Sequence, residues 1–245
     1  MLTTVNLCSI VAAVKMTVSK EDYLKAILEA EAEGQTVISA TLTTWLTVSA
    51  PAVSMAIRRL RRDGLVRVQR DGRLRLSPAG LQIALRTTLR HHLIERMLAE
   101  IFGMEWYRVH DEAERLEHAV SPDFEARLLH KLGRGGKCPH GNLMSPEEPA
   151  ARRNRGLVLL AEASEGRGYT VDSIYERDRG LLEFLDLRGI RPGARVKVLA
   201  RNYDQTLTLI TNRGRVSLGG PAAERVWVAN ESRSFRTTLR NSSTD

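Results

Sequence analysis

The order of elements in the first eighty residues most constrains the fold. Three helical segments come first, each with apolar residues at helical spacing. Two short strands follow, and Asp71-Gly72 between them is a strong signal for a β-hairpin. The predicted helices and strands cover residues 19–34, 39–46, 49–63, 65–69 and 73–76. Three helices followed by a hairpin are typical of a winged helix-turn-helix, a fold that reads double-stranded DNA.

The charge distribution points in the same direction. Between Arg58 and Arg75 the sequence has eight arginines against Asp63 and Asp71. The whole chain has 37 Lys and Arg against 29 Asp and Glu, for a net charge of +8. Such a balance favours an anionic partner, although a solvated helix face is the alternative for the arginines. Aromatic residues make up only 5% of the chain, which argues against a module that stacks single-stranded bases.

The third helix and the hairpin therefore supply the candidate DNA contacts. Small residues at the start of the helix suit base edges and thymine methyl groups, whereas the arginines suit phosphates. Because few long polar side chains stand at the reading end, we expect DNA shape to contribute. The candidate residues are Ser49, Pro51, Ala52, Ser54, Met55, Arg58, Arg59, Arg62, Arg70 and Arg73.

The middle of the chain predicts a helical domain. A long helix begins after Ser77 and ends before Gly103, a second spans 106–120, and a third runs from Ser121 to Gly133. The Pro-rich segment 144–155 is predicted to be a linker. Short apolar strands at 156–160, 194–199, 205–211, 215–218 and 225–228, with one helix at 181–187, then predict a small barrel.

Histidines and carboxylates gather at helical spacing in this middle region. His110, Glu114, Glu117 and His118 follow an i, i+4, i+7, i+8 pattern, which places them on one helix face. His91 and Glu95 are four residues apart on the long helix. Imidazoles and carboxylates without a thiolate suit a hard-to-borderline divalent ion such as Mn²⁺ or Fe²⁺. The alternative is a salt-bridged surface helix, in which arginines pair with these carboxylates.

Together these segments resemble the diphtheria-toxin-repressor (DtxR) family of metal-dependent transcriptional regulators. The similarity runs from about residue 16 to 142 and continues more weakly into the barrel, which resembles the SH3-like domain of longer members. The segments that carry it are Ser49-Ala50-Pro51-Ala52-Val53-Ser54, Arg62-Asp63-Gly64-Leu65-Val66, His91 with Glu95, Val109-His110-Asp111-Glu112-Ala113, Leu116-Glu117-His118 and Cys138-Pro139-His140-Gly141-Asn142.

The resemblance implies two metal sites per subunit. The primary site would use Asp22, Glu114, Glu117 and His118, and an ancillary site would use His91, Glu95 and His110. Glu162 and Glu165 are candidate additions to the ancillary site from the SH3-like domain.

Metal preference follows from the same comparison. The iron-responsive branch typically has Met and Cys at the positions of Asp22 and Glu114, so the two carboxylates resemble the manganese-responsive branch and harden the site. Lys25 is a departure, because that branch often has an acidic residue there and a cation cannot be a ligand. Asp22 has an alternative role as part of a helix N-terminal cap with Ser19.

The predicted architecture is mainly α with small β parts. It comprises an N-terminal extension, a winged helix-turn-helix DNA-binding domain, a helical metal-binding and dimerisation domain, a linker, a C-terminal SH3-like β-barrel and a tail. Their respective boundaries are 1–15, 16–85, 86–143, 144–155, 156–231 and 232–245.

The expected function is metal-dependent repression of metal-uptake genes. Mn²⁺ would be the co-repressor, with Fe²⁺ as the alternative, and a homodimer would bind a pseudo-palindromic operator. Two cysteines provide no disulfide framework, and no apolar run of membrane-spanning length is present, so we expect a cytoplasmic protein without a membrane partner. The resemblance to transcriptional regulators implies that the protein is not an enzyme. The competing hypotheses are a metalloenzyme with a carboxylate-bridged ion pair and a metal-independent architectural DNA binder.

Overall fold

The computed structural model describes residues 16–231, which form two compact units. The first contains the described residues up to 103 together with 112–138 and 143–151. The second contains 104–111, 139–142 and the described residues from 152 onward. Segments 1–15 and 232–245, the predicted extension and tail, lie outside the described residues.

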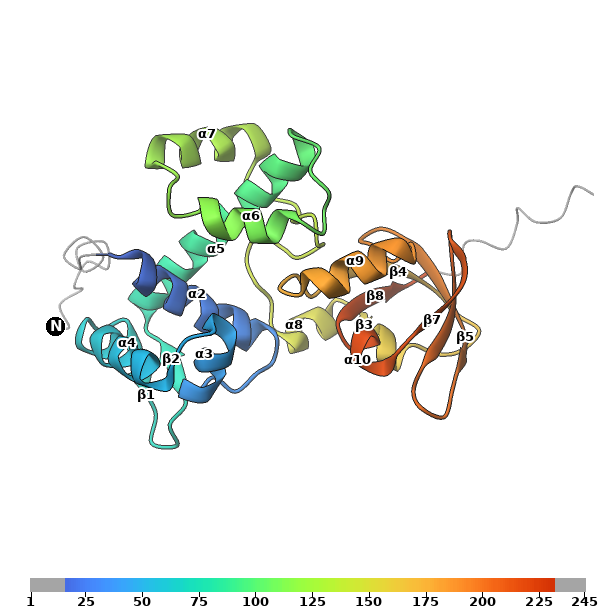
Figure 1. Ribbon diagram of the computed structural model, residues 1–245, viewed down its shortest axis with the longest axis horizontal. Helices are drawn as coiled ribbons and strands as arrows, with labels where there is room; N and C mark the ends of the chain where they lie inside the picture. Colours follow the sequence, from blue (N-terminus) through green and yellow to red (C-terminus); the bar gives the residue numbers. More distant parts are fainter. Residues whose placement is uncertain (1–15, 232–245) are drawn as a thin grey trace, which may run out of the picture. The chain divides into compact units, whose positions relative to one another are not determined.

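The first unit begins with the predicted helices and hairpin (Figure 1). Its elements are α2 (Val18–Ala32), α3 (Ser39–Leu46), α4 (Ala50–Arg62), β1 (Val66–Val68) and β2 (Leu74–Leu76). The strands pair antiparallel around the Asp71-Gly72 turn, with Val66 opposite Leu76. Apolar residues of all five elements form one core, so the winged helix-turn-helix prediction is confirmed.

Local capping explains where these helices begin. Ser49 accepts a hydrogen bond from the Ala52 amide at 3.4 Å, which starts α4 as predicted. The prediction that Ser19 caps α2 is wrong, because the helix begins at Val18 after Thr17. Asp22 therefore lies inside the helix, and its carboxylate is available for a contact outside it.

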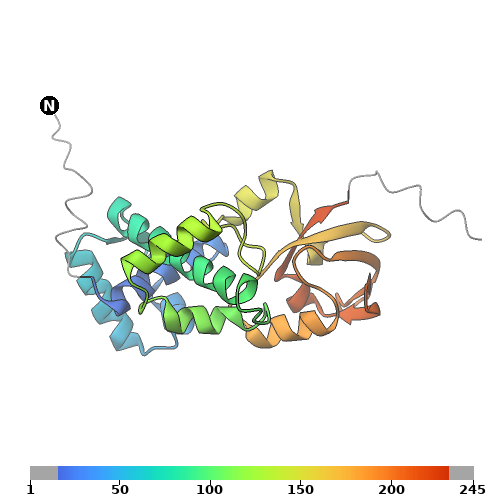
Figure 2. The same ribbon diagram turned by 90° about the horizontal axis from the view of Figure 1, so that it is seen from above.

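The remaining helices of the first unit are α5 (Pro78–Glu100), α7 (Pro122–Leu132) and most of α6 (Val109–Leu116). Ser77 and Ser121 cap α5 and α7 as predicted. Helix α5 contacts both α2 and α7 (Figures 1 and 2). Helix α6 is shorter than the predicted 106–120. The Glu117 amide nevertheless donates to the Ala113 carbonyl, so the helical hydrogen-bond pattern continues one residue beyond the end of α6.

The second unit contains an antiparallel six-stranded sheet in the order β3-β8-β4-β5-β6-β7. The strands are β3 (Leu157–Leu159), β4 (Gly168–Ile174), β5 (Arg195–Arg201), β6 (Leu207–Thr211), β7 (Gly214–Leu218) and β8 (Val226–Asn230). The 3₁₀ turn η1 (Leu160–Glu162) and helices α9 (Arg179–Leu187) and α10 (Gly220–Ala223) complete it around a second apolar core.

Neither η1 nor α10 was predicted from the sequence, and two further elements of this region were also missed. Strand β4 escaped notice because Asp172 and Ser173 interrupt its apolar alternation, where the pairing with β8 also shifts register. The predicted linker 144–155 contains a short helix, α8 (Pro149–Asn154), which begins at a proline suited to a first helical turn.

Gly80 lies where α5 packs closely against the backbone just before the hairpin. A Cβ atom there would collide with the backbone carbonyl of Leu65. We predict that Gly80→Ala lowers stability by about 1–3 kcal/mol through overpacking, although Gly→Ala in a helix usually stabilises. Thermal unfolding of Gly80→Ala checks this, with Gly135→Ala as the control because its Cβ would meet nothing within 4 Å. A melting temperature equal to the control's would contradict the packing argument.

Candidate metal centre and nucleic-acid interface

Asp22, Glu117 and His118 converge within the first unit. Asp22 comes from α2, whereas Glu117 and His118 come from the turn after α6. The Nε2 atom of His118 lies 2.7 Å from Oδ1 of Asp22 and 3.3 Å from Oε1 of Glu117. One ligand atom from each of the three residues lies within 4.8 Å of the others, close enough to share one metal ion.

The donor chemistry of this cluster fits a divalent ion. Glu117 is fully buried, and among the described residues its Oε1 atom accepts no hydrogen bond. A buried carboxylate oxygen without a hydrogen bond is costly unless a cation binds it. Two carboxylates and one imidazole are the oxygen and nitrogen donors that Mn²⁺ and Fe²⁺ accept.

Lys25 occupies the side of Glu117 that faces α5. Its Nζ atom donates to Oε2 of Glu117 at 2.8 Å and to Oε1 of Glu114 at 2.9 Å, and it lies 3.0 Å from Nδ1 of His91. Glu114, a predicted primary ligand, is thus bound to Lys25 and does not join the cluster of Asp22, Glu117 and His118. Lys25 itself is only 2% exposed.

Electrostatics favour the charged forms of Lys25 and Glu117. Burial alone would lower the pKa of Lys25, but Glu29, Glu117 and Glu114 outweigh it and raise that pKa above its ordinary value. Burial would raise the pKa of Glu117, but His91 and Lys25 hold it below its usual range. In contrast, burial raises the pKa of Asp22, with His118 offsetting only part of the effect.

His91 lies between Lys25, Glu117 and Glu95. Its Nδ1 atom is 2.7 Å from Glu117 Oε2, and its Nε2 atom is 3.0 Å from Glu95 Oε1. Burial and Lys25 lower the pKa of His91, but Glu95 and Glu117 outweigh them and raise it.

The predicted ancillary residues are divided between the units. His91 and Glu95 lie on α5 in the first unit, whereas His110 belongs to the second. In the second unit the ring centroids of His110 and His140 are 6.2 Å apart, and Nδ1 of His140 is 3.6 Å from Oε2 of Glu176.

The two candidate additions to that site are engaged elsewhere. Both carboxylate oxygens of Glu162 accept from Arg153 at 2.8 Å, and Glu165 accepts from the Arg201 amide at 2.8 Å. Sequence reasoning missed Glu176 as the carboxylate beside His140, and it missed Glu21, whose Oε2 atom is 3.0 Å from Nδ1 of His118. The position of Glu21 directly before Asp22 was the available signal.

Helix α4 buries one face and exposes the other. Val53, Ile57 and Leu60 pack into the core. All ten candidate DNA-contact residues, from Ser49 to Arg73, are exposed. Arg62 and Arg73 form ion pairs with Asp63 and Asp71 at 3.2 and 3.0 Å, which an approaching phosphate would compete with.

Asp22 of the candidate metal cluster and the candidate DNA-reading helix α4 line the same small cavity. This cavity of about 370 Å³ is lined by Asp22 of α2 and by Ala52, Met55 and Arg59 of α4, among others. Lys20 of α2 also forms a 2.7 Å ion pair with Asp63 at the end of α4. The position of α4 therefore depends on the position of α2.

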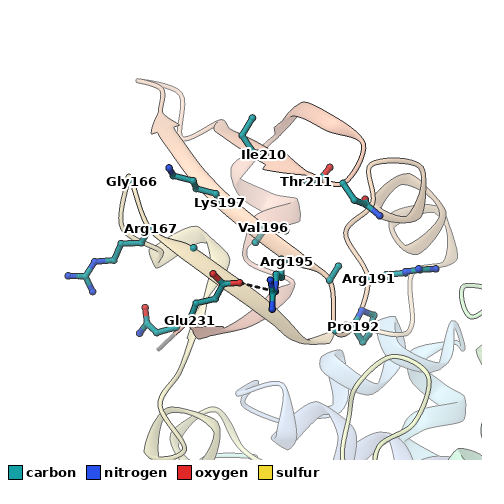
Figure 3. A pocket seen from close by; sticks show the side chains of 15 residues that line it. Gly166, Arg167, Arg191, Pro192, Arg195, Val196, Lys197, Ile210, Thr211 and Glu231 are labelled. Atoms are coloured by element: carbon teal, nitrogen blue, oxygen red, sulfur yellow. Dashed lines mark ion pairs between the residues drawn. The ribbon is translucent and has the colours of Figure 1, made fainter. Parts of the chain in front are cut away.

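An open groove in the second unit has different chemistry (Figure 3). It is lined by Arg167, Arg191, Arg195 and Lys197, and Glu231 forms a 3.4 Å ion pair with Arg195. Its lining includes no histidine or cysteine, so this groove is not a candidate metal centre.

Across residues 16–231, no single helix has the length and apolar character needed to cross a membrane. The bent pair α3 and α4 meets that test by length and composition alone.

Comparison with known proteins assigns three consecutive segments. Residues 15–74 match the N-terminal DNA-binding domain of iron-dependent repressors, and residues 77–145 match their metal-binding and dimerisation domain. Residues 158–230 match the FeoA domain.

Individual relatives match half of the chain or more. The iron-dependent repressor IdeR of Mycobacterium leprae is 33% identical over 221 residues, which cover 85% of this chain and 95% of that protein. The diphtheria toxin repressor of Corynebacterium diphtheriae is 41% identical over 122 residues, which cover 50% of this chain and 54% of that protein.

Solved structures of metal-dependent regulators are also similar to this chain. A manganese-dependent transcriptional repressor in complex with manganese is 34% identical, with a TM-score of 0.76 over 86% of this chain and all of that one. The manganese regulator SloR is 25% identical, with a TM-score of 0.71 over 88% of this chain and all of that one. The chain therefore belongs to the diphtheria-toxin-repressor family of metal-dependent, DNA-binding transcriptional repressors, whose members are not enzymes.

Proposed function

We propose that this repressor uses Mn²⁺ as its co-repressor and controls genes of metal uptake. The observation that carries the proposal is the convergence of Asp22, Glu117 and His118, three hard-to-borderline donors, with one buried oxygen of Glu117 accepting no hydrogen bond among the described residues. Fe²⁺ is the second candidate, because relatives over most of the chain are named iron-dependent repressors. The lack of a thiol or thioether in the cluster favours Mn²⁺.

Asp22, Glu117 and His118 hold the ion at the primary site, and Glu114 joins them if it leaves Lys25. The bound ion supplies positive charge that offsets repulsion among the carboxylates. Asp22 then fixes α2 to the turn after α6. Because Lys20 binds Asp63 at the end of α4, fixing α2 also limits the movement of α4.

The proposed assembly is a homodimer on a pseudo-palindromic operator. A two-fold axis places two copies of α4 at a set separation, which the operator half-sites must match. Metal and DNA then each tighten the binding of the other, because both favour the same arrangement of α4. His91, Glu95 and His110 are proposed as the second, ancillary site of each subunit.

We assign base contacts to exposed residues at the start of α4, namely Ser49, Pro51, Ala52, Ser54 and Met55. The arginines farther along the helix and in the hairpin contact phosphates. The hydroxyl groups of Ser49 and Ser54 can bond bases or phosphates, whereas Pro51 and Ala52 suit thymine methyl groups.

Asp22→Ala tests the metal switch. We predict that Mn²⁺ tightens binding of wild-type protein to an operator-containing duplex and that chelator reverses it. In Asp22→Ala the required Mn²⁺ concentration rises by at least about tenfold, because one direct ligand is lost. Fluorescence anisotropy under anaerobic conditions, with Mn²⁺ and Fe²⁺ titrated separately, measures both effects and assigns the metal.

The matched control is Asp123→Ala, which removes an exposed aspartate that pairs with Arg127 on α7. It should respond to metal like wild type. Operator binding that chelator leaves unchanged would contradict the metal-switch proposal and favour a constitutive DNA binder.

Arg58→Ala tests the phosphate contacts on α4. We predict weaker binding to every duplex by a similar factor, and a slope of log affinity against log salt that is smaller by about 1. Arg127→Ala, an exposed arginine on α7, is the control and should leave the slope unchanged. If Arg58→Ala weakened only operator binding and left the slope unchanged, the phosphate assignment would be wrong.

A further inference from the structure

Lys25 lies where several metal-ligand atoms converge. Its Nζ atom is within 2.8–3.0 Å of a histidine nitrogen and two carboxylate oxygens, which belong to His91, Glu114 and Glu117. These partners come from α5, α6 and the turn after α6, whereas Lys25 comes from α2. A carboxylate oxygen of Glu29 lies 4.0 Å away.

The partners of Lys25 form a donor set that suits a divalent ion. One imidazole and two carboxylates, all converging on one point, are the same donors as in the cluster of Asp22, Glu117 and His118. An ammonium group cannot be a ligand, because it has three donors and no lone pair. At this point, however, it supplies the positive charge that an ion would supply.

We infer that the Lys25 ammonium is a built-in cation that takes the place of a divalent ion among His91, Glu114 and Glu117. This inference rests on the proposed function in one respect, namely that the adjoining cluster takes a divalent ion. Each subunit accordingly binds one ion fewer than its carboxylates and histidines could hold.

Glu117 connects the two positions. Its Oε2 atom accepts from Lys25, whereas its Oε1 atom accepts no hydrogen bond among the described residues and lies 3.3 Å from Nε2 of His118. The same carboxylate thus faces a permanent cation on one side and the candidate metal site on the other.

Because the Lys25 ammonium is part of α2, its contact with Glu117 does not require a bound metal ion. The link from α2 to Glu117 through Lys25 does not depend on metal concentration, whereas the link through Asp22 does. Part of the attachment of α2 is therefore present in metal-free protein, and the single ion of the primary site completes it.

The test exchanges the ammonium for a ligand. In Lys25→Glu, a carboxylate joins the donor set, and we expect this variant to bind one more Mn²⁺ per subunit than wild type. Lys131→Glu, the same charge change at an exposed position on α7, should bind the wild-type number. Equilibrium dialysis against Mn²⁺ followed by elemental analysis counts the ions without any DNA present.

Thermal unfolding supplies a second readout. Removing Lys25 leaves Glu117 buried without its cation, so Lys25→Glu and the neutral Lys25→Met should melt below wild type in chelator. Saturating Mn²⁺ should recover most of that loss, and it should stabilise both variants more than it stabilises wild type.

The outcomes separate this inference from the proposed function. If wild type binds Mn²⁺ and neither variant gains an ion, the inference is wrong and the metal switch stands. If neither variant folds even in saturating Mn²⁺, the inference is also wrong, because the donor set then does not accept a divalent ion in place of the ammonium. If wild type binds no Mn²⁺, the proposed function fails, whereas an added ion in Lys25→Glu would still support the inference.

Discussion

The attachment of α2 to the turn after α6 connects the candidate metal centre to the DNA-reading helix. Two polar contacts one helical turn apart make it, from Asp22 to His118 and from Lys25 to Glu117. Both lie in a buried or half-buried environment, where unpaired charges are costly and paired charges hold their geometry. Helix α2 also packs against α3 and α4, so these contacts reach the helix with the exposed arginines.

Buried carboxylates give this attachment its sensitivity to cations. Glu95 and Glu117 are fully buried beside His91, and Glu114 and Glu29 lie close by. The protein therefore concentrates negative charge where water cannot screen it, and stability there requires compensating positive charge. Lys25 provides some of that charge permanently, and the cluster of Asp22, Glu117 and His118 has the donors to obtain the rest from an ion.

Features set by short-range sequence signals were predictable. The caps at Ser49, Ser77 and Ser121 all lie where the sequence indicated, because a capping serine followed within two residues by proline specifies a helix start locally. Strand β4 could not be found in this way, since Ser173 is buried although it is polar. Burial of that residue depends on pairing with β8, which lies more than fifty residues away in the chain.

The candidate metal centre was predictable only in part. Helical spacing placed Glu114, Glu117 and His118 on one face, but it could not show that Lys25 would bind Glu114 and part of Glu117. That contact depends on how α2 packs against α5 and α6, which periodicity within one helix does not specify. The resemblance to known repressors identified Lys25 as unusual without showing what it contacts.

Anomalous scattering from a manganese-loaded crystal would locate the bound ion directly. We expect a manganese peak within coordination distance of Asp22, Glu117 and His118, with the Lys25 ammonium still bound to Glu117. A peak among His91, Glu114 and Glu117 with Lys25 displaced, or no peak beside Asp22, would contradict it.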